Sequence, residues 1–151
     1  MPFSSRTSLP HKQRGAAAIE FAVVFIIFFA VFYGVVSYSL PLLMMQSFNA
    51  AASEAVRRSV ALSPAAVNYD QLVVSQARSV VMTQLAWMPA SLGFTTSDAT
   101  VTYTAGVLTV RIAYPKTRLM RVLPFLTLPG IGEVPRLPAQ LSAQASMKLV
   151  P

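Results

Sequence analysis

The hydrophobic pattern of the chain begins with a long, almost uninterrupted apolar run. Residues 16–36 read AAAIEFAVVFIIFFAVFYGVV and contain one charged residue, Glu20. About 20 apolar residues in a helix cross a hydrocarbon core about 30 Å thick. We therefore predict a single transmembrane helix over residues 16–40.

After this run, apolar residues recur at helical spacing. The stretch LLMMQSFNAAASEAVRRSVAL predicts an amphipathic helix that Pro64 ends. Pro41 lies at its start and either kinks one long helix or begins a second one. A further helix is predicted from Asn68, where Asn68 and Gln71 resemble a capping box, to about Trp87. The apolar faces of the two helices contain Leu43, Phe48, Ala51, Ala55 and Val56, and Leu72, Val73, Ala77, Val80, Val81 and Leu85.

Beyond Pro89 the period changes from helical spacing to alternation. Two β-strands are predicted, about 99–104 and 107–114, with a tight turn at Ala105–Gly106 in which Gly106 supplies the unusual backbone angles. Residues 115–138 are rich in proline and predict a loop with a short helical turn near 119–123. Alternation over residues 141–149 predicts a third strand.

These elements predict an α+β fold. An N-terminal transmembrane helix is extended by amphipathic helices and is followed by a small three-stranded antiparallel sheet. The exported α+β domain is expected to comprise residues 41–151, with its helices covering the sheet. Because a two-stranded hairpin alone is marginal in water, the C-terminal strand is expected to be needed for folding.

Charge predicts the orientation of the chain. Three basic residues, Arg6, Lys12 and Arg14, precede Gly15, and no acidic residue does. By the positive-inside rule, this basic leader of residues 1–15 stays in the cytoplasm, and the C-terminal domain crosses the membrane. A cleaved secretory signal is less favoured, because the apolar run exceeds the usual length of about 7–15 residues and no A-x-A site closes it.

Few residues in the chain are suited to catalysis or metal binding. There is no cysteine, and the one histidine, His11, lies in the leader. Four acidic residues in different sequence contexts, Glu54, Asp70, Asp98 and Glu133, follow the apolar run. We find no phosphate-binding loop, and the remaining basic residues are scattered, Arg57–Arg58 being the only adjacent pair. The sequence therefore predicts no enzyme, no cofactor, no metal site and no nucleic-acid partner.

Aromatic residues form a series in the apolar run. Phe21, Phe25, Phe28 and Phe32 follow an i, i+4, i+7, i+11 pattern, which predicts one continuous stripe on the helix. Either lipid or a second helix can cover such a stripe. Gly34 permits close approach of a neighbouring helix, although no second small residue completes a dimerisation motif.

Glu20 is the unusual residue of the run. A carboxylate near the centre of a membrane helix costs about 2.5–3.5 kcal/mol, and less near the edge, where Glu20 lies and where it can reach the headgroups. Its surroundings, RGAAAIEF, combine Arg14–Gly15, three small residues and Ile19-Glu20-Phe21. This segment resembles the processing site of prepilin-like proteins, and most closely that of the TadE/TadF-like pseudopilins of the tight-adherence (Flp pilus) system. The Ala/Arg-rich helix and the alternating strands are also similar to those of TadE-like chains.

The resemblance implies cleavage between Gly15 and Ala16 by a membrane prepilin peptidase, and a role for Glu20 and Phe21 in assembly. Other pilins or pseudopilins and the assembly platform in the inner membrane are the implied partners. The chain is then a minor pseudopilin, anchored in the inner membrane with a periplasmic domain. The alternative is an unprocessed, single-pass, membrane-anchored periplasmic scaffold or binding protein.

The i, i+4 spacing of Ala16 and Glu20 gives the carboxylate a partner after cleavage. The new α-ammonium of Ala16 would lie about 6 Å from Glu20 along the helix axis, in the same chain. An ammonium from a neighbouring subunit can serve equally, and the resemblance implies this second pairing. Either one relieves a charge that is otherwise buried alone.

Overall fold

The computed structural model describes residues 11–128, 130 and 132–149, with the backbone alone for residues 11–14 and 128. Its first element is the helix α1, His11–Ser59. The chain divides between Val36 and Ser37 into two compact units, so the N-terminal part of α1 and the C-terminal domain of residues 37–151 are described separately. The first ten residues of the predicted leader lie outside the described residues.

Pro41 lies inside α1 and does not begin a second helix. Of the two alternatives left by the sequence, the single long helix is therefore the observed one. Pro41 has no N–H to donate to the carbonyl of Ser37, one turn earlier, and its side chain is buried in the domain. The helix ends at Ser59, five residues before Pro64, which was predicted to end it. The Ser59 hydroxyl is buried and donates a hydrogen bond of 2.8 Å to the carbonyl of Ala55.

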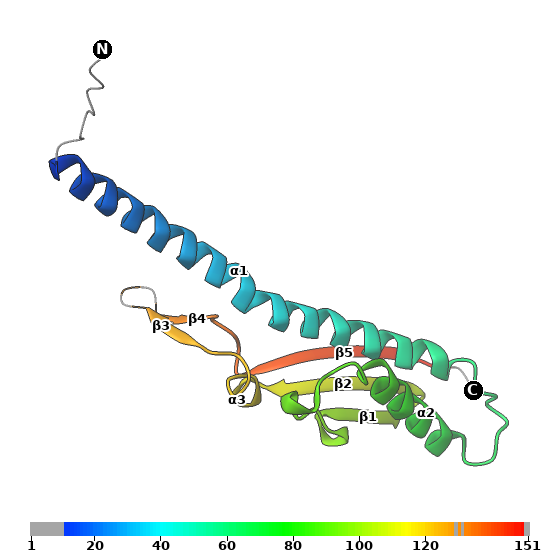
Figure 1. Ribbon diagram of the computed structural model, residues 1–151. Helices are drawn as coiled ribbons and strands as arrows, with labels where there is room; N and C mark the ends of the chain where they lie inside the picture. Colours follow the sequence, from blue (N-terminus) through cyan, green and yellow to red (C-terminus); the bar gives the residue numbers. More distant parts are fainter. Residues whose placement is uncertain (1–10, 129, 131, 150–151) are drawn as a thin grey trace, which may run out of the picture. The chain divides into compact units, whose positions relative to one another are not determined.

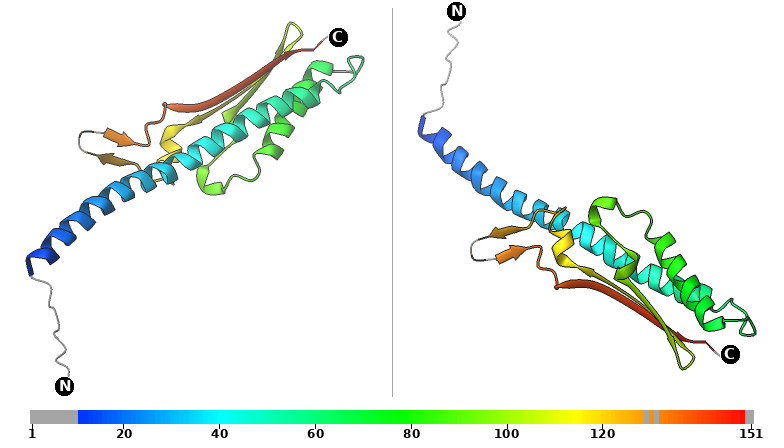
Figure 2. Two further views of the ribbon diagram at one scale, coloured as in Figure 1. Left: turned by 90° about the horizontal axis from the view of Figure 1, so that it is seen from above. Right: turned by 90° about the horizontal axis from the view of Figure 1, so that it is seen from below.

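The C-terminal domain has two layers (Figures 1 and 2). One layer is a sheet in the order β1-β2-β5, with β1 at Ala99–Thr104, β2 at Val107–Pro115 and β5 at Gln140–Lys148. Both strand pairs are antiparallel. The C-terminal part of α1 and the helix α2, Tyr69–Gln84, cover one face of this sheet. The predicted α+β fold class and the three-stranded sheet are confirmed.

Alternation along β2 separates the buried face of the sheet from the polar one. Leu108, Val110, Ile112 and Tyr114 are fully buried, whereas Arg111 is exposed. On the outer face, the hydroxyls of Thr109 and Ser146 lie 3.0 Å apart across β2 and β5. The alternation predicted for β5 holds at Leu141, Ala143 and Leu149 but fails at Met147, which is 41% exposed near the end of the strand.

Helix α1 supplies a large part of the core. The ring of Phe48 lies between those of Phe94 and Tyr114, with centroid distances of 5.9 and 6.2 Å. Two residues of the predicted apolar faces are not buried, because Leu43 is 48% and Leu72 is 42% exposed. The buried residues of α1 in this domain are Met44, Phe48, Ala51, Ala52, Ala55 and Val56.

The start of α2 differs from the predicted capping box. Asn68 is the N-cap but adopts left-handed angles, φ 59° and ψ 38°, and its side chain makes no capping hydrogen bond. Its carbonyl instead accepts hydrogen bonds of 3.0 Å from the N–H groups of Gln71 and Leu72. Asparagine tolerates this conformation better than most residues, which explains its place here. The helix ends at Gln84, three residues before Trp87.

The hairpin between β1 and β2 turns at Ala105 and Gly106, as predicted. Both residues have positive φ, 51° for Ala105 and 75° for Gly106, so the unusual angles are not confined to the glycine. Two successive positive φ values are typical of the type I′ turn, whose twist matches that of the strands. The Gly106 carbonyl also accepts a hydrogen bond of 2.7 Å from Leu149, which joins the turn to the end of the third strand.

The segment predicted as a loop contains more structure than its prolines indicate. A short helix α3 spans Lys116–Leu119, slightly before the predicted turn, and two three-residue strands, β3 at Leu126–Leu128 and β4 at Gly132–Val134, form an antiparallel hairpin. This hairpin lies beyond the end of the main sheet at which β5 begins (Figure 1). Two short 3-10 helices, η1 at Ala90–Leu92 and η2 at Thr96–Asp98, precede β1.

Candidate processing and assembly site

The N-terminal part of α1 presents apolar side chains on all sides. Its large hydrophobic residues are 47–70% exposed between Ile19 and Val36, apart from Tyr33. Within the described residues, α1 from Gly15 is the one helix long and apolar enough to span a membrane. Its most apolar 18 residues have a mean hydropathy of 2.6. Leaving this much apolar area in water is unfavourable by about 25 cal/mol per Å². The segment therefore requires lipid or other helices around it, as expected of a single-pass membrane anchor.

The aromatic residues of this segment stack in two rows. Phe21, Phe25, Phe29 and Tyr33 follow one another at i, i+4, with ring centroids 6.0, 6.3 and 6.4 Å apart. Phe28 and Phe32 form the second row, at 6.1 Å. Side chains three and four residues apart are neighbours on a helix surface, so the second row lies beside the first. The predicted stripe of Phe21, Phe25, Phe28 and Phe32 therefore lies along one broad face of α1.

Gly15 and Ala16 both lie in α1 and both are exposed. A Cβ built on Gly15 meets no other atom within 4 Å, so the fold itself does not require a glycine there. Because α1 begins at His11, the peptide bond between the two residues is helical. A peptidase that binds its substrate in extended form must first unwind this turn, and glycine lowers the cost by about 1 kcal/mol relative to alanine.

Glu20 lies one helical turn after Ala16 on the exposed surface of α1. Among the residues whose side chains the structure describes, it forms no ion pair. In the uncleaved chain the nitrogen of Ala16 belongs to a peptide bond and carries no charge. The structure therefore places the Glu20 carboxylate one turn from a backbone nitrogen that carries no charge.

The other carboxylates lie apart and have different partners. Glu54 of α1 pairs with Arg57 and Arg58 at 2.6 Å, and the hydrogen bond from Arg58, followed by that from Arg57, lowers the pKa of Glu54. Glu133 of β4 pairs with Lys116 at 2.6 Å. Asp70 lies in the first turn of α2. No group of three metal-ligating side chains occurs in the part of the chain that the structure describes.

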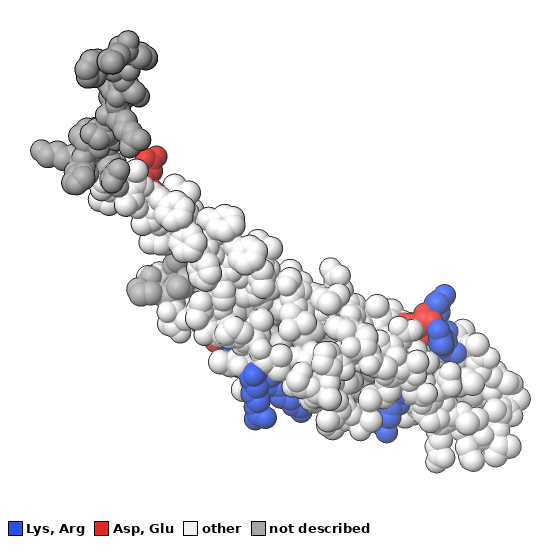
Figure 3. Space-filling view, in the orientation of Figure 1, with Lys and Arg blue, Asp and Glu red and all other residues white. Residues whose placement is uncertain are grey.

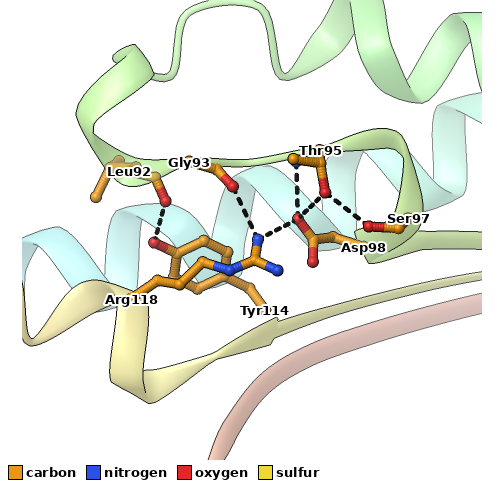
Figure 4. A network of polar contacts seen from close by, with 7 residues as sticks. All are labelled: Leu92, Gly93, Thr95, Ser97, Asp98, Tyr114 and Arg118. Atoms are coloured by element: carbon orange, nitrogen blue, oxygen red, sulfur yellow. Dashed lines mark hydrogen bonds and ion pairs between the residues drawn. The ribbon is translucent and has the colours of Figure 1, made fainter.

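Asp98 is the one buried carboxylate of the described residues, and its environment is structural (Figure 4). Its Oδ2 accepts hydrogen bonds from the Thr95 N–H at 2.8 Å and from Arg118 Nη1 at 2.7 Å. Arg118 Nη1 also donates to the Gly93 carbonyl at 2.8 Å. Next to it, the Tyr114 hydroxyl donates to the Leu92 carbonyl at 2.5 Å, and burial raises the pKa of Tyr114. These bonds hold the segment between η1 and β1 against α3.

Sequence reasoning missed this network. It named Asp98 only as one of four acidic residues in different sequence contexts and did not connect it with Arg118, which lies 20 residues later. The sequence Thr95-Thr96-Ser97-Asp98 contains the signal, since a threonine followed three residues later by an acid is typical of a capping box. The pairing with Arg118 has no such local signal, because it depends on β2 returning the chain to η2.

Comparison with known families is informative for α1. The model of the family of TadE-like proteins matches residues 15–57, which include the apolar segment, Glu20 and the helix as far as Arg57. No curated protein and no solved structure matches the chain. TadE-like proteins are associated with pili of the tight-adherence system and are not an enzyme family. Over residues 15–57, which lie in α1, this chain is therefore similar to the TadE-like proteins.

Proposed function

We propose that the chain is a minor pseudopilin of a tight-adherence (Flp) pilus, processed by prepilin peptidase between Gly15 and Ala16. The observation that carries the proposal is the spacing at the start of α1. A glycine and a small residue, both exposed, stand one turn before a carboxylate at the edge of an exposed apolar helix. The TadE-like match begins at the same glycine.

The proposed sequence of events follows from charge. The basic leader of residues 1–15 holds the N-terminus in the cytoplasm of a bacterium, and the C-terminal domain lies in the periplasm. Cleavage removes the leader and creates an α-ammonium on Ala16. Glu20 then neutralises this ammonium within its own chain or the ammonium of a neighbouring subunit, which relieves two charges that lipid solvates poorly. Pairing between subunits also fixes the axial register of packed helices.

Two features of α1 support assembly through protein contacts. The two aromatic rows lie side by side on one broad face, so the helix can contact other pilins there while lipid covers the remainder. Phe21 begins the first row next to Glu20 and would be covered in the same contact. In this proposal the partners are prepilin peptidase, other pilins or pseudopilins, and the pilus assembly platform of the inner membrane.

The mature N-terminus tests the proposal directly. In cells with an active prepilin peptidase, we expect mass spectrometry of the purified protein to give an N-terminal peptide beginning at Ala16. Cells whose peptidase carries an inactivated catalytic aspartate provide the control, and there the leader stays attached. An intact leader in both strains would contradict the proposal and favour an unprocessed periplasmic scaffold or binding protein.

Replacement of Glu20 separates processing from assembly. We expect Glu20→Ala and Glu20→Gln to be cleaved normally, because both leave Gly15 and Ala16 in place, but to reduce the number of pili about tenfold. Loss of one partner from a poorly solvated ion pair is worth more than the 1.4 kcal/mol that a tenfold change requires. Pilus counts by electron microscopy and the N-terminal peptide from the same cells provide the two measurements.

Glu54→Ala is the matched control, because it removes the other glutamate of α1, whose arginine partners lie on the exposed surface of the domain. We expect normal pili in that variant. Normal pilus number in Glu20→Ala would leave only interaction with the lipid headgroups as the role of Glu20.

A further inference from the structure

We propose that the C-terminal domain docks on the surface of the membrane that anchors it, through a basic and apolar surface that binds anionic phospholipid headgroups. This surface, here called the docking surface, consists of Lys116, Met120, Arg121, Val122, Leu126 and Arg136. The inference rests on the membrane anchor of the proposed function and does not depend on leader cleavage.

Covalent connection brings this surface to the membrane. Tyr38 follows Val36, the last residue of the apolar run, by two residues, which corresponds to about 3 Å along a helix. Within the C-terminal domain, the Tyr38 hydroxyl oxygen accepts a hydrogen bond of 2.8 Å from the backbone N–H of Arg136. Whatever the orientation of the domain, Tyr38 and Arg136 therefore lie close to the membrane boundary.

Hydrogen bonds join α3 and the β3–β4 hairpin to this point. The backbone N–H of Lys116 donates to the Ala139 carbonyl at 2.9 Å, three residues after Arg136. The Lys116 ammonium pairs with Glu133 of β4 at 2.6 Å and lies 5.4 Å from the ring centroid of Phe125. The residues of the docking surface thus belong to one end of the domain.

Positive charge is in excess at this end. Figure 3 shows lysine and arginine side chains gathered over α3. Lys116 and Arg118 are paired with Glu133 and Asp98. Arg121 is exposed and forms no ion pair among the described side chains. A basic side chain near an anionic membrane surface is attracted to it within about one Debye length, about 8 Å at physiological salt.

Exposed apolar side chains flank the arginine. Met120 and Val122 are 45% and 41% exposed on either side of Arg121, and Leu126 of β3 is 38% exposed. The same end also carries an apolar groove of about 250 Å³, lined by Tyr38, Pro41, Leu42, Met45, Leu137, Pro138 and Leu141. Basic residues interleaved with exposed apolar ones are typical of surfaces that lie in the headgroup region of a bilayer.

The short tether explains why lipid is the partner that fits this surface. The docking surface is hydrogen-bonded to Tyr38, two residues after the anchor, so it experiences a high effective concentration of headgroups and weak contacts suffice. The other basic pair of the domain, Arg57 and Arg58, is neither free of an acidic partner nor close to the anchor. Arg57 and Arg58 share Glu54 as an ion-pair partner, and they lie about 20 residues, or roughly 30 Å, along α1 from Tyr38.

Site-specific labelling of the full chain tests the proposal. The protein has no cysteine, so Val122→Cys introduces a single site for an environment-sensitive dye. The labelled protein is reconstituted into vesicles of phosphatidylcholine alone or of an equal mixture with phosphatidylglycerol. We expect blue-shifted emission and quenching by spin-labelled lipid in the mixed vesicles, and at least a twofold smaller quenching in phosphatidylcholine alone or at high salt. A label at Val60→Cys, an exposed position two residues after Arg58, is expected to stay in contact with water in both kinds of vesicle.

Two charge reversals identify the basis of the docking. In the Val122→Cys background, Arg121→Glu is expected to weaken docking in mixed vesicles by roughly tenfold or more, because it removes one attraction and adds a repulsion. Arg78→Glu makes the same change on an exposed arginine of α2 and is expected to leave docking unchanged.

A Val122 label that remains in water in both kinds of vesicle would overturn the proposal, and so would one that leaves water only when another pilin is added. Flotation of the protein with the vesicles reports the membrane anchor independently, and the mature N-terminus reports processing. Failure of docking is therefore distinguishable from failure of the proposed function.

Discussion

Deletion of residues 140–151 is expected to unfold the C-terminal domain. It removes β5, which pairs with all nine residues of β2 from Val107 to Pro115. It also removes Leu141, Ala143 and Leu149 from the core and leaves β1 and β2 as the only two strands of the main sheet. A two-stranded hairpin is marginal in water. We expect the free energy lost with β5 and its three core side chains to exceed the total stability of about 5–15 kcal/mol that is usual for a domain.

Limited proteolysis of the intact and truncated chains, both in the same detergent, measures the effect of this deletion. We expect the truncated domain to be digested under conditions in which the intact domain survives. Gln144→Ala, which changes the exposed face of β5 and keeps the strand, is expected to retain the protection of the intact chain. Full protease resistance of the truncated protein would show that the helices and the hairpin fold without β5.

Substitution of Gly15 is expected to abolish processing without affecting the fold. A Cβ at this position meets no atom within 4 Å, so alanine and valine both fit the folded chain. Gly15→Ala stabilises the helical turn by about 1 kcal/mol, which alone reduces local unwinding about fivefold. Gly15→Val adds two methyl groups beside the bond to be cut, and we expect it to leave the leader attached.

The fraction of mature protein, measured by mass spectrometry in cells with active peptidase, checks this expectation. Gly34→Ala is the matched control, because Gly34 also lies in α1 and a Cβ there also meets no atom within 4 Å. We expect normal cleavage in that variant. Normal cleavage of Gly15→Val would show that the peptidase, if it acts on this chain, does not cut after residue 15.

Elements with a clear period over many residues were predictable from the sequence. The strands of the main hairpin are confirmed to within one residue because β-branched residues alternate over their whole length. The hairpin of β3 and β4 was missed because each strand has three residues, too few for a period of two to be recognised among prolines. Leu43 and Leu72 were assigned to the apolar faces of their helices but are exposed, because periodicity alone does not determine the width of a buried face.

The residues of the candidate site could be proposed from the sequence for a different reason. Gly15, Ala16, Glu20 and Phe21 lie within seven residues of one another, and a helix fixes their spacing without any tertiary contact. The docking surface and the Asp98–Arg118 pair depend instead on residues that β2 and the following loop bring together. Such contacts between distant residues leave no local pattern in one sequence.

The position of Phe48 and Met44 in the core sets a limit on how the protein can be shortened. Both belong to α1, the helix that also carries the apolar segment, and both are fully buried in the C-terminal domain. A soluble fragment that begins after Ser59 therefore lacks one wall of its own hydrophobic core. Secretion, crystallisation or immunisation with the domain alone requires a fragment that starts near Ser37, at the boundary between the two compact units.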